Sequence, residues 1–492
     1  MGAVRRDLEG GLIEGLWADE LFADEIPPRH GTHFAGFGDA HGNDLTVAIG
    51  AHAGVKRGRL FLEATVLTPK HSKHGGIVAH VSARSVQDAW RKVERSLLMD
   101  AFEQAVRAVR PKVVLHGALP EPPEGRLLLL ALGKAADAMM REAVRSYEAL
   151  GVAFEGLLVA PAAAVAPLQH PDVERLEGQH PVPGTASVAA GRALLAKAAT
   201  ATANDLVVLL LSGGGSALAV DPVADLDVAD LAGLHQALLD SGVPIEAMNV
   251  VRRRVDRLKG GGLALAAAPA PVVALAVSDV VGDDPLAIAS GPTVGDPYGP
   301  QDACEVLDRF AIAAPRIREM LAAEERGERS GPPRPNDPRL DSVRTSLVAT
   351  NRRALEAAAD VMTAAGYRAI LVADDVTGDA RVAGRSAAAE LATRWRAGER
   401  GVALLSGGET TVKVRGSGRG GRNSTFALAC ALALPADVPA YGLVADSDGI
   451  DGRGGHAGAF LDPFLVERIG RDVTMRFDAN DDSYGAFEAA NA

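Results

Sequence analysis

Short runs of apolar residues recur along the chain from residue 113 onward and alternate with longer alanine-rich stretches. The runs of strand length cover residues 126–132, 154–161, 205–212, 270–279, 367–374, 401–407 and 440–446. Strands that are apolar at every position are typical of a parallel sheet buried on both faces. Because helical stretches such as 134–150 separate the runs, we predict a doubly wound, mostly parallel α/β fold whose ligands bind at the carboxyl ends of its strands.

The pattern breaks at two places, and these breaks predict the domain organisation. Residues 324–342 are charged, contain four prolines and lack apolar periodicity, so we interpret residues 326–342 as a linker. We therefore expect a large domain over residues 91–325 and a smaller α/β domain over residues 343–492. Residues 1–90 are rich in glycine and histidine and lack crossover helices, and we assign no function to this extension. A metal site there is left open, although solvated loop histidines explain the spacing better.

Composition and charge narrow the class of partner. The chain has 492 residues, of which 47% are apolar, and its formal net charge is −12. This balance argues against nucleic acid or an anionic membrane as a partner and favours a small-molecule substrate, which needs a local basic site if it is anionic. Cys304 and Cys430 cannot form a disulfide framework and are interpreted as packed residues in helices. The chain start lacks the apolar core of a signal peptide, and no apolar run is long enough to span a membrane, so we expect a cytoplasmic protein. A homodimer is left open.

Candidate chemistry gathers where the predicted strands end. Lys134 follows the first strand and opens a helix, a position that suits an anion, although a solvated lysine explains the pattern equally well and the Walker A signature is incomplete. After the third strand the sequence reads LSGGGSALAV, and its glycines can form a nest of backbone N–H groups flanked by hydroxyls. The stretch LLSGGETT at residues 404–411 repeats this pattern, and we predict a second phosphate-binding turn there. A tight turn alone uses the same residues. The residues of these two candidate phosphate-binding turns are Ser212, Gly213, Gly214, Gly215, Ser216, Gly407, Gly408, Glu409 and Thr410.

Acidic residues also stand at strand ends. Asp279 lies at the tip of the fourth strand, and Asp283 follows beyond a glycine. A carboxylate there can hold Mg²⁺ or accept a proton, whereas a helix cap or an Asx turn is the alternative. Residues 446–451 place three further aspartates among glycines. An EF-hand is excluded because the twelfth position of that loop is Ala457 rather than Glu.

Two basic segments complete the set. Arg419 and Arg422 lie in a glycine-rich loop before a helix, where a guanidinium can contact a carboxylate or a phosphate in a bidentate way, and a solvated loop is the alternative. Arg252 and Lys259 lie in a second segment, in which ordinary helix capping explains the lysine equally well. Cations, glycine nests and acidic strand ends together point to phosphoryl transfer, which depends on positioned phosphates, a divalent ion and charge stabilisation.

Several long motifs, in one order along residues 93–492, resemble the class II glycerate 2-kinases. They read LSGGGSAL, LKGGGLA, SDVVGDDPLAIASGPTVGDP, LSGGETTVKVRGSGRGGRN and DSDGIDG. In that family a large Rossmann-like domain precedes a smaller domain called MOFRL. The resemblance implies ATP- and Mg²⁺-dependent phosphorylation of the 2-hydroxyl of D-glycerate, giving 2-phosphoglycerate, in a cleft between the domains.

The resemblance also implies roles for individual residues. Lys134 would stabilise the transferred phosphoryl group or bind substrate, Asp279 would act as base or Mg²⁺ ligand, and Arg422 would bind the carboxylate or the developing charge. The implied nucleotide-binding loops are residues 212–216 and 407–410. The implied substrate-binding residues are Arg252, Lys259, Arg419 and Asn423. The implied metal ligands are Asp279, Asp283 and Asp448.

Two departures and two rival functions accompany the resemblance. The family usually reads GGRNQE where this chain has GGRNSTF, so Ser424 and Thr425 are expected to shift acceptor preference. Family members continue through a further strand beyond the equivalent of residue 492, so we expect a truncated MOFRL-type domain. An NAD(P)H-dependent hydroxypyruvate reductase is one rival, although the G-x-G-x-x-G fingerprint lacks its third glycine. A non-catalytic protein that binds a sugar acid is the other.

Overall fold

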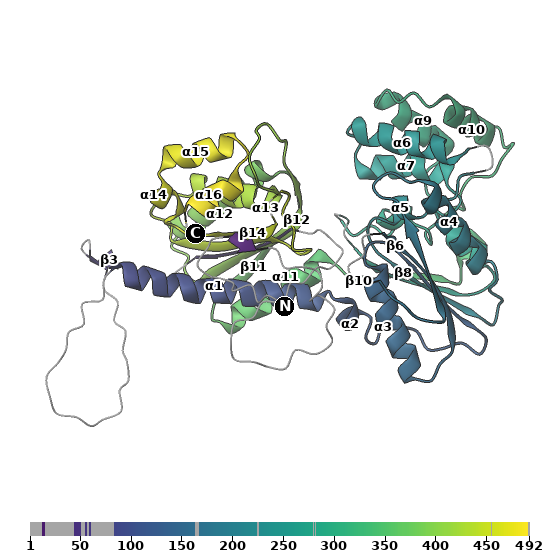
Figure 1. Ribbon diagram of the computed structural model, residues 1–492, viewed down its shortest axis with the longest axis horizontal. Coiled ribbons are helices and arrows are strands. Elements are labelled where there is room, and N and C mark those ends of the chain that lie inside the picture. Colours follow the sequence, from purple (N-terminus) through teal and green to yellow (C-terminus); the bar gives the residue numbers. More distant parts are fainter. Residues whose placement is uncertain are drawn as a thin grey trace. The chain divides into compact units, whose positions relative to one another are not determined.

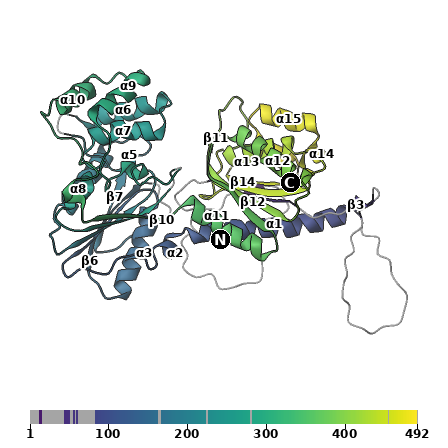
Figure 2. The same cartoon turned by 180° about the vertical axis from the view of Figure 1, so that it is seen from behind.

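The computed structural model describes most of the chain as two units (Figure 1, Figure 2). It covers residues 12–14, 44–50, 55–56, 59–60 and 83–490, apart from residues 163–166, 224–225, 279, 281 and 454. The large unit comprises the described residues from 106 to 354. The small unit joins the described residues from 355 to 490 with those of 12–14 and 44–105.

The large unit is built on a six-stranded sheet in the order β10-β9-β8-β5-β6-β7, in which all neighbouring strands are parallel. Its strands are β5 (Leu127–Leu132), β6 (Phe154–Pro161), β7 (Val173–Gly178), β8 (Leu206–Leu211), β9 (Val272–Val277) and β10 (Val343–Ala349). Its helices are α2 (Pro111–Val114), α3 (Ala136–Ala149), α4 (Thr185–Ala198), α5 (Gly215–Leu218), α6 (Val228–Asp240), α7 (Ile245–Val255), α8 (Gly262–Ala267), α9 (Pro300–Arg309) and α10 (Pro315–Glu325), with 3₁₀ turns η2 (Ile288–Ser290) and η3 (Pro338–Leu340).

The central strands of this sheet are covered on both faces, as their apolar pattern predicts. Every residue of β5 and β8 is buried. Leu128, Leu130 and Leu132 point to one face and share a core with residues of α4 and α8. Helix α3 packs against β5 and β6. The doubly wound α/β fold is therefore confirmed, and the ends of β5 and β8 meet at one edge of the sheet.

A second core lies among helices of the large unit. Helices α6, α7, α9 and α10 form a group that Figure 1 shows together at one end of the sheet. Leu234, Leu238, Val251 and Leu307 are among its buried residues. This packing fixes the face of α7 that carries Asn249 and Arg252.

The small unit has a mixed six-stranded sheet in the order β1-β14-β13-β2-β12-β11, and of its pairs only β11 with β12 is parallel. Its strands are β1 (Leu12–Glu14), β2 (Asp44–Gly50), β11 (Arg368–Asp379), β12 (Val402–Thr411), β13 (Ala440–Asp446) and β14 (His456–Leu461), with the separate hairpin β3 (Val55–Lys56) and β4 (Arg59–Leu60). Its helices are α11 (Asn351–Ala364), α12 (Ala380–Arg396), α13 (Arg422–Ala433), α14 (Leu465–Ile469), α15 (Arg471–Ala479), α16 (Ser483–Ala489) and most of α1 (Ala83–Ala108). Residues of α12, α13 and α16 share a core with the sheet.

The strand pairing differs from the expected domain boundaries in three places. Strand β10, expected at the start of the smaller domain, pairs with β9 at the edge of the large sheet. Strand β2, expected in an extension of unknown role, lies between β12 and β13. Part of the expected linker is packed, since Asp296 donates its backbone N–H to the carbonyl oxygen of Pro333 at 2.8 Å. Sequence distance hides such pairings, because strand partners far apart in the chain leave no local pattern.

Strands β7, β10 and β14 lack the long apolar run of the predicted strands and were not predicted. Strand β7 reads VERLEG, and β10 alternates half-buried and exposed residues over most of its length, as edge strands do. Strand β14 lies within a glycine-rich stretch. Within residues 83–490, as far as they are described, no helix has both the length and the apolar character needed to cross a membrane.

Candidate active site

The turn after β8 leaves four consecutive backbone N–H groups without an acceptor. Within the described chain, no hydrogen bond engages the N–H groups of residues 213–216. Gly213 and Gly215 are buried, and Gly214 lies at φ +81°, in the left-handed region that glycine favours. A buried N–H without a partner costs about 1–3 kcal/mol unless water or a ligand accepts its hydrogen bond. The turn is thus a concave group of donors suited to an anion, which supports the nest predicted there.

Lys134 lies beside this nest. Its backbone N–H donates to the carbonyl oxygen of Gly213 at 2.9 Å, and the N–H of Ala135 donates to the hydroxyl of Ser212 at 3.0 Å. A Cβ built on Gly214 would lie 3.1 Å from Cγ of Lys134, so the lysine side chain runs past the bare backbone of that glycine. The structure therefore brings Lys134 and the nest together at the carboxyl ends of two neighbouring strands.

The turn η2 closes against the nest from a third direction. The buried hydroxyl of Ser290 lies 2.7 Å from the hydroxyl of Ser216 and donates to Oδ1 of Asn249 at 2.9 Å. Ala289 and Ser290 have left-handed φ angles of +50° and +60°. A Cβ on Gly215 would lie 2.6 Å from Cβ of Ala289, so no larger residue fits there. Backbone strain of this kind concentrates at functional sites.

His180 is a neighbour of the nest to which the sequence analysis assigned no role. Its Cδ2 lies 3.4 Å from the position of a Cβ on Gly214. His180 follows the carboxyl end of β7, as Lys134 follows the carboxyl end of β5, and ligands of such folds bind at these ends. It was missed because β7 is a charged edge strand that the apolar pattern did not reveal. Ser290 and Asn249 were missed because they meet the nest only through tertiary packing.

Arg252 and Lys259 are both buried but differ in their partners. Lys259 is 1% exposed, forms an ion pair with Asp256 and donates to the carbonyl oxygen of Ala219 at 3.3 Å. Arg252 is 5% exposed, and no described residue forms a hydrogen bond or an ion pair with its guanidinium. Burial alone lowers the pKa of Arg252 to about 10, so the group stays charged at neutral pH.

The acidic candidates of the large unit lie after β9. Asp279 lies outside the described residues. Asp283 has a left-handed φ of +54°, and its carboxylate accepts no hydrogen bond within the described chain. The neighbouring Asp284 accepts the N–H of Leu286 at 2.9 Å, which is the Asx turn that the sequence left open. The described residues contain no group of three His, Cys, Asp or Glu side chains placed to hold a metal ion.

The second glycine-rich turn, predicted at residues 404–411, is part of a strand instead. Strand β12 continues through these residues, and Gly408 pairs with Val376 of β11 and with Asp44 of β2. A Cβ on Gly408 would lie 2.1 Å from the carbonyl oxygen of Val376, so this glycine permits close strand pairing. The prediction of a turn was wrong. The local sequence is the same whether a strand continues through its glycines, as β12 does, or ends at them.

Arg422 joins the carboxyl ends of β12 and β13. Its Nη1 lies 2.9 Å from Oε1 of Glu409, and its Nη2 donates to Oδ2 of Asp446 at 2.7 Å. The Asp446 side chain is almost completely buried, whereas half of Glu409 is exposed. The structure thus brings two predicted site residues, Arg422 and Glu409, into direct contact.

Asp451 holds the first turn of α13, on which Arg422 lies. Its buried carboxylate accepts the backbone N–H groups of Asn423 and Ser424, each at 2.8 Å. A Cβ on Gly421 would lie 2.2 Å from Oδ1 of Asp451, so the glycine makes this approach possible. Burial acts to raise the pKa of Asp451, but hydrogen bonds from His456, Ser424 and the start of α13 hold it below its ordinary value. Asp451 therefore fixes the backbone from which Arg422 extends.

The two remaining candidates of the small unit contact other groups. Arg419 forms an ion pair with Glu488 at 2.6 Å, and its guanidinium lies 4.5 Å from the ring centre of Tyr484. Asp448 accepts the N–H of Ile450 at 2.8 Å within its own loop. Neither contact brings these side chains to Arg422.

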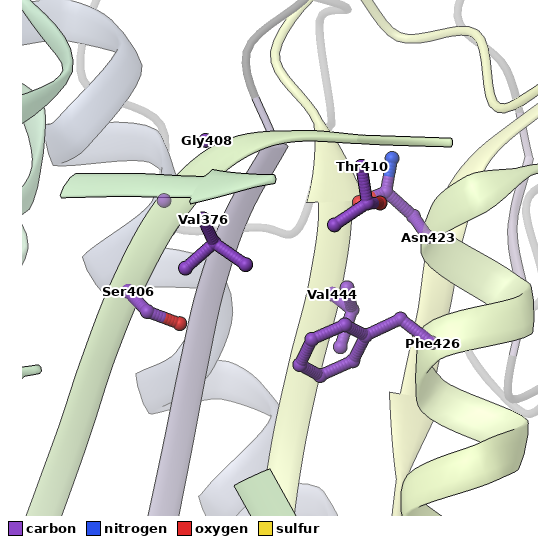
Figure 3. A pocket seen from close by; sticks show the side chains of 8 residues that line it. Val376, Ser406, Gly408, Thr410, Asn423, Phe426 and Val444 are labelled. Atoms are coloured by element: carbon purple, nitrogen blue, oxygen red, sulfur yellow. The ribbon is translucent and has the colours of Figure 1, made fainter. Parts of the chain in front are cut away.

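A small cavity lies under β12 and α13 (Figure 3). Figure 3 shows the polar ends of Thr410 and Asn423 close together, with the ring of Phe426 and the side chains of Val376 and Val444 around the apolar part. Its enclosed volume is about 10 Å³, far below the roughly 300–1,000 Å³ of sites for drug-sized ligands, so the cavity has room for a water-sized group and not for a nucleotide.

Two family models match the chain. Residues 97–322 match the model described as "Domain of unknown function (DUF4147)", and residues 402–492 match the MOFRL family. Together they repeat the two-domain order that the sequence motifs implied.

The alignments with similar proteins cover nearly the whole length of each of those proteins. A protein of Agrobacterium vitis, provisionally named as a hydroxypyruvate reductase, is 37% identical over 418 residues, covering 81% of this chain and 91% of that protein. The D-glycerate 2-kinase of Thermotoga maritima is 32% identical over 404 residues, covering 81% of this chain and 94% of the kinase. A crystal structure of glycerate kinase from Thermotoga maritima superposes with a TM-score of 0.72 at 31% identity, again over 81% of this chain and 94% of that one. The expected resemblance is confirmed, and the chain belongs to the glycerate 2-kinase family.

Proposed function

We propose that this protein is an ATP- and Mg²⁺-dependent kinase that phosphorylates the 2-hydroxyl of D-glycerate to give 2-phosphoglycerate. The Thermotoga maritima relative is named as a D-glycerate 2-kinase. We propose the same activity for the present chain because it belongs to the same family. The observation that supports it most strongly is the nest at residues 213–216 beside Lys134, whose four N–H groups form no hydrogen bond with any described residue.

The nest binds phosphate oxygens, and Lys134 supplies the positive charge. Backbone N–H groups are fixed before the substrate arrives, so they stabilise developing negative charge without reorganisation. The Lys134 ammonium adds a point charge on the same side as Gly214. In phosphoryl transfer such positioning and charge stabilisation supply most of the catalysis.

The carboxylates of the acidic segment after β9 are suitable ligands for Mg²⁺. Mg²⁺ takes one or two carboxylates together with substrate phosphates, and the Asp283 carboxylate has no other partner in the described chain. Asp283 would hold the ion together with Asp279, and the bound ion would neutralise phosphate charge. In the alternative arrangement Asp283 would hold the ion without Asp279, and Asp279 would act as the base that takes the proton of the attacking hydroxyl.

For Arg422, in the small unit, the proposed role is to bind the glycerate carboxylate. In the present structure its guanidinium contacts the carboxylates of Glu409 and Asp446. A substrate carboxylate offers a guanidinium the same planar pair of oxygen atoms. A substrate carboxylate that displaces the exposed Glu409 side chain from Arg422 leaves the buried contact between Arg422 and Asp446 intact.

A hydroxypyruvate reductase is the second candidate, because the Agrobacterium vitis relative carries that name provisionally. One pair of assays separates the candidates. ADP formation from ATP, Mg²⁺ and D-glycerate is expected, with 2-phosphoglycerate as the product. Loss of NADH or NADPH absorbance with hydroxypyruvate, and no ADP formation, would replace the kinase by the reductase. Binding of glycerate with neither reaction would support a non-catalytic sugar-acid-binding protein.

A further inference from the structure

Strand β2 lies between β12 and β13 in the small sheet, although it comes from a part of the chain that neither family model matches. Each of its residues, 44–50, pairs antiparallel with a residue of β13. On its other side β2 pairs antiparallel with β12, where Val47 lies opposite Leu405. The sequence DLTVAIG suits this place, because Thr46, Val47 and Ile49 are β-branched and favour strands. The N-terminal extension, to which the sequence analysis assigned no function, therefore supplies an internal strand.

Strands β12 and β13 depend on β2 for hydrogen bonds. In the described chain these two strands pair with β2 and not with each other. Neighbouring strands lie about 4.8 Å apart, so strands on either side of a third are roughly 10 Å apart, too far for a direct hydrogen bond. Every residue of β13 is buried, and so are residues 402–405 of β12. Without β2, the backbone groups of β12 and β13 that face it would be buried and unpaired, which destabilises a folded protein.

The same spacing determines the surroundings of Arg422. Its Nη1 lies 2.9 Å from Oε1 of Glu409, near the end of β12, and its Nη2 lies 2.7 Å from Oδ2 of Asp446, at the end of β13. Asp44, the first residue of β2, pairs with Gly408 and with Asp446. One guanidinium thus contacts carboxylates on both neighbours of β2, at the level where β2 begins. The separation of these two carboxylates depends on the strand that lies between them.

We propose that residues 44–50 are a positioning element for Arg422. As a permanent strand of the small sheet, they hold Glu409 and Asp446 at a separation that one guanidinium spans. The strand acts through Arg422 rather than on the substrate. Its effect on glycerate binding rests on the proposed function, whereas its place in the sheet does not.

Amide hydrogen exchange of the wild-type full chain tests the place of β2 without any substitution. The amides of residues 45–49 are expected to exchange at least about 10²-fold more slowly than in an unstructured peptide, at rates similar to those of β12 and β13. Rates close to those of an unstructured peptide overturn the proposal. This measurement does not depend on kinase activity.

Val47→Pro tests whether β12 and β13 depend on β2, with Lys56→Pro as the matched control. A proline in an internal strand removes a hydrogen bond of the ladder. Lys56 lies in the hairpin of β3 and β4, in the same extension but outside the six-stranded sheet. Val47→Pro should accelerate exchange in β12 and β13 at least about tenfold and leave β5 and β8 of the large unit unchanged, whereas Lys56→Pro should change neither.

Equal exchange of β12 and β13 in these two variants overturns the proposal. If Val47→Pro does not fold, Val47→Gly replaces it, with Lys56→Gly as control. Glycine weakens a strand but keeps the backbone N–H, so the same acceleration is expected to a smaller extent and in the same strands. Unchanged exchange in Val47→Gly also overturns the proposal.

Kinetics with D-glycerate test whether β2 acts through Arg422. Val47→Pro should raise KM for D-glycerate at least about tenfold and leave KM for ATP unchanged, because a displaced Arg422 binds the substrate carboxylate less well. A smaller folded fraction alone would lower the apparent kcat and change neither KM. In the double variant with Arg422→Ala, the loss in kcat/KM should equal that of Arg422→Ala alone. Unchanged KM values or additive losses overturn the proposal. Slow exchange of residues 45–49 in a protein without kinase activity refutes the proposed function and leaves the place of β2 in the sheet standing.

Discussion

The hydroxyl of Ser424 donates a hydrogen bond of 2.6 Å to the buried carboxylate of Asp451. The same carboxylate accepts two backbone N–H groups of α13, so one negative charge holds the beginning of the helix that carries Arg422. A negative charge at this end of a helix is also favoured by the helix dipole. Ser424, one of the two residues that depart from the family pattern, is thus part of the support for the arginine.

Asp451→Asn is expected to destabilise the protein by about 1–3 kcal/mol. Both carboxylate oxygens accept hydrogen bonds from N–H or O–H donors, so an amide must turn its NH₂ group toward a donor. Urea unfolding measures the loss. Asp227→Asn is the control, because Asp227 caps α6 with an exposed carboxylate, and an asparagine caps equally well there. Equal losses for the two variants would contradict the role of the buried network.

The contribution of Asp451 to stability should disappear in acid. Its pKa is held below its ordinary value in the folded protein, so the stabilisation is complete above the unfolded pKa of about 3.9 and is lost as the pH falls through the folded value. The difference in unfolding free energy between wild type and Asp451→Asn should be constant from neutral pH to about pH 5 and shrink below about pH 4. A difference that grows as the pH falls contradicts this assignment.

Gly214→Ala should reduce kinase turnover while a glycine elsewhere tolerates the same change. The alanine Cβ would lie 3.1 Å from Lys134 on a backbone with φ +81°, so both the nest and the lysine must move. We expect a loss of about 10²-fold in kcat/KM, the scale that follows removal of one positioned donor. Gly233 in α6 has nothing within 4 Å of a Cβ, and Gly233→Ala should leave turnover unchanged and stabilise the helix by about 0.5–1 kcal/mol. Wild-type activity of Gly214→Ala refutes the nest.

Arg422→Ala should lower kcat/KM with D-glycerate, with a matched arginine as control. Arg468 is paired with a nearly buried aspartate, Asp462, as Arg422 is with Asp446, and the two arginine side chains are similarly exposed at 24% and 21%. Both variants leave a buried carboxylate without its cation, so both should lose stability. Only Arg422→Ala should also lose about 10²-fold or more in kcat/KM. Equal kinetic losses would assign Arg422 a structural role.

The parallel sheet was predictable because burial on both faces leaves a local signal. Strands such as β5 and β8 are apolar at every position, and the polar residues that follow them come together at one edge. The proximity of Lys134 to residues 213–216 follows from that rule and from the order of the strands.

The parts that were not predictable depend on partners distant in the chain. Strand β2 lies between β12 and β13, although hundreds of residues separate it from them in the chain. The sequence of β2 does not indicate which strands it pairs with. His180 follows a charged edge strand, and Asp451 acts through backbone groups of another segment. Gly407 and Gly408 predicted a turn but lie in strand β12, which pairs with β11. Both a tight turn and the close approach of β11 favour a residue without a side chain, so the sequence does not distinguish them.

Lys134→Ala tests the central claim most directly, in an assay of ADP formation from ATP, Mg²⁺ and D-glycerate. Lys197→Ala is the control, because that lysine of the same unit pairs with Glu155 and has no contact with the nest among the interactions described. With Lys134 and the N–H groups of residues 213–216 binding the transferred phosphoryl group, Lys134→Ala should lose about 10²–10³-fold in kcat/KM, and Lys197→Ala should match wild type. Wild-type turnover by a folded Lys134→Ala protein would contradict the account.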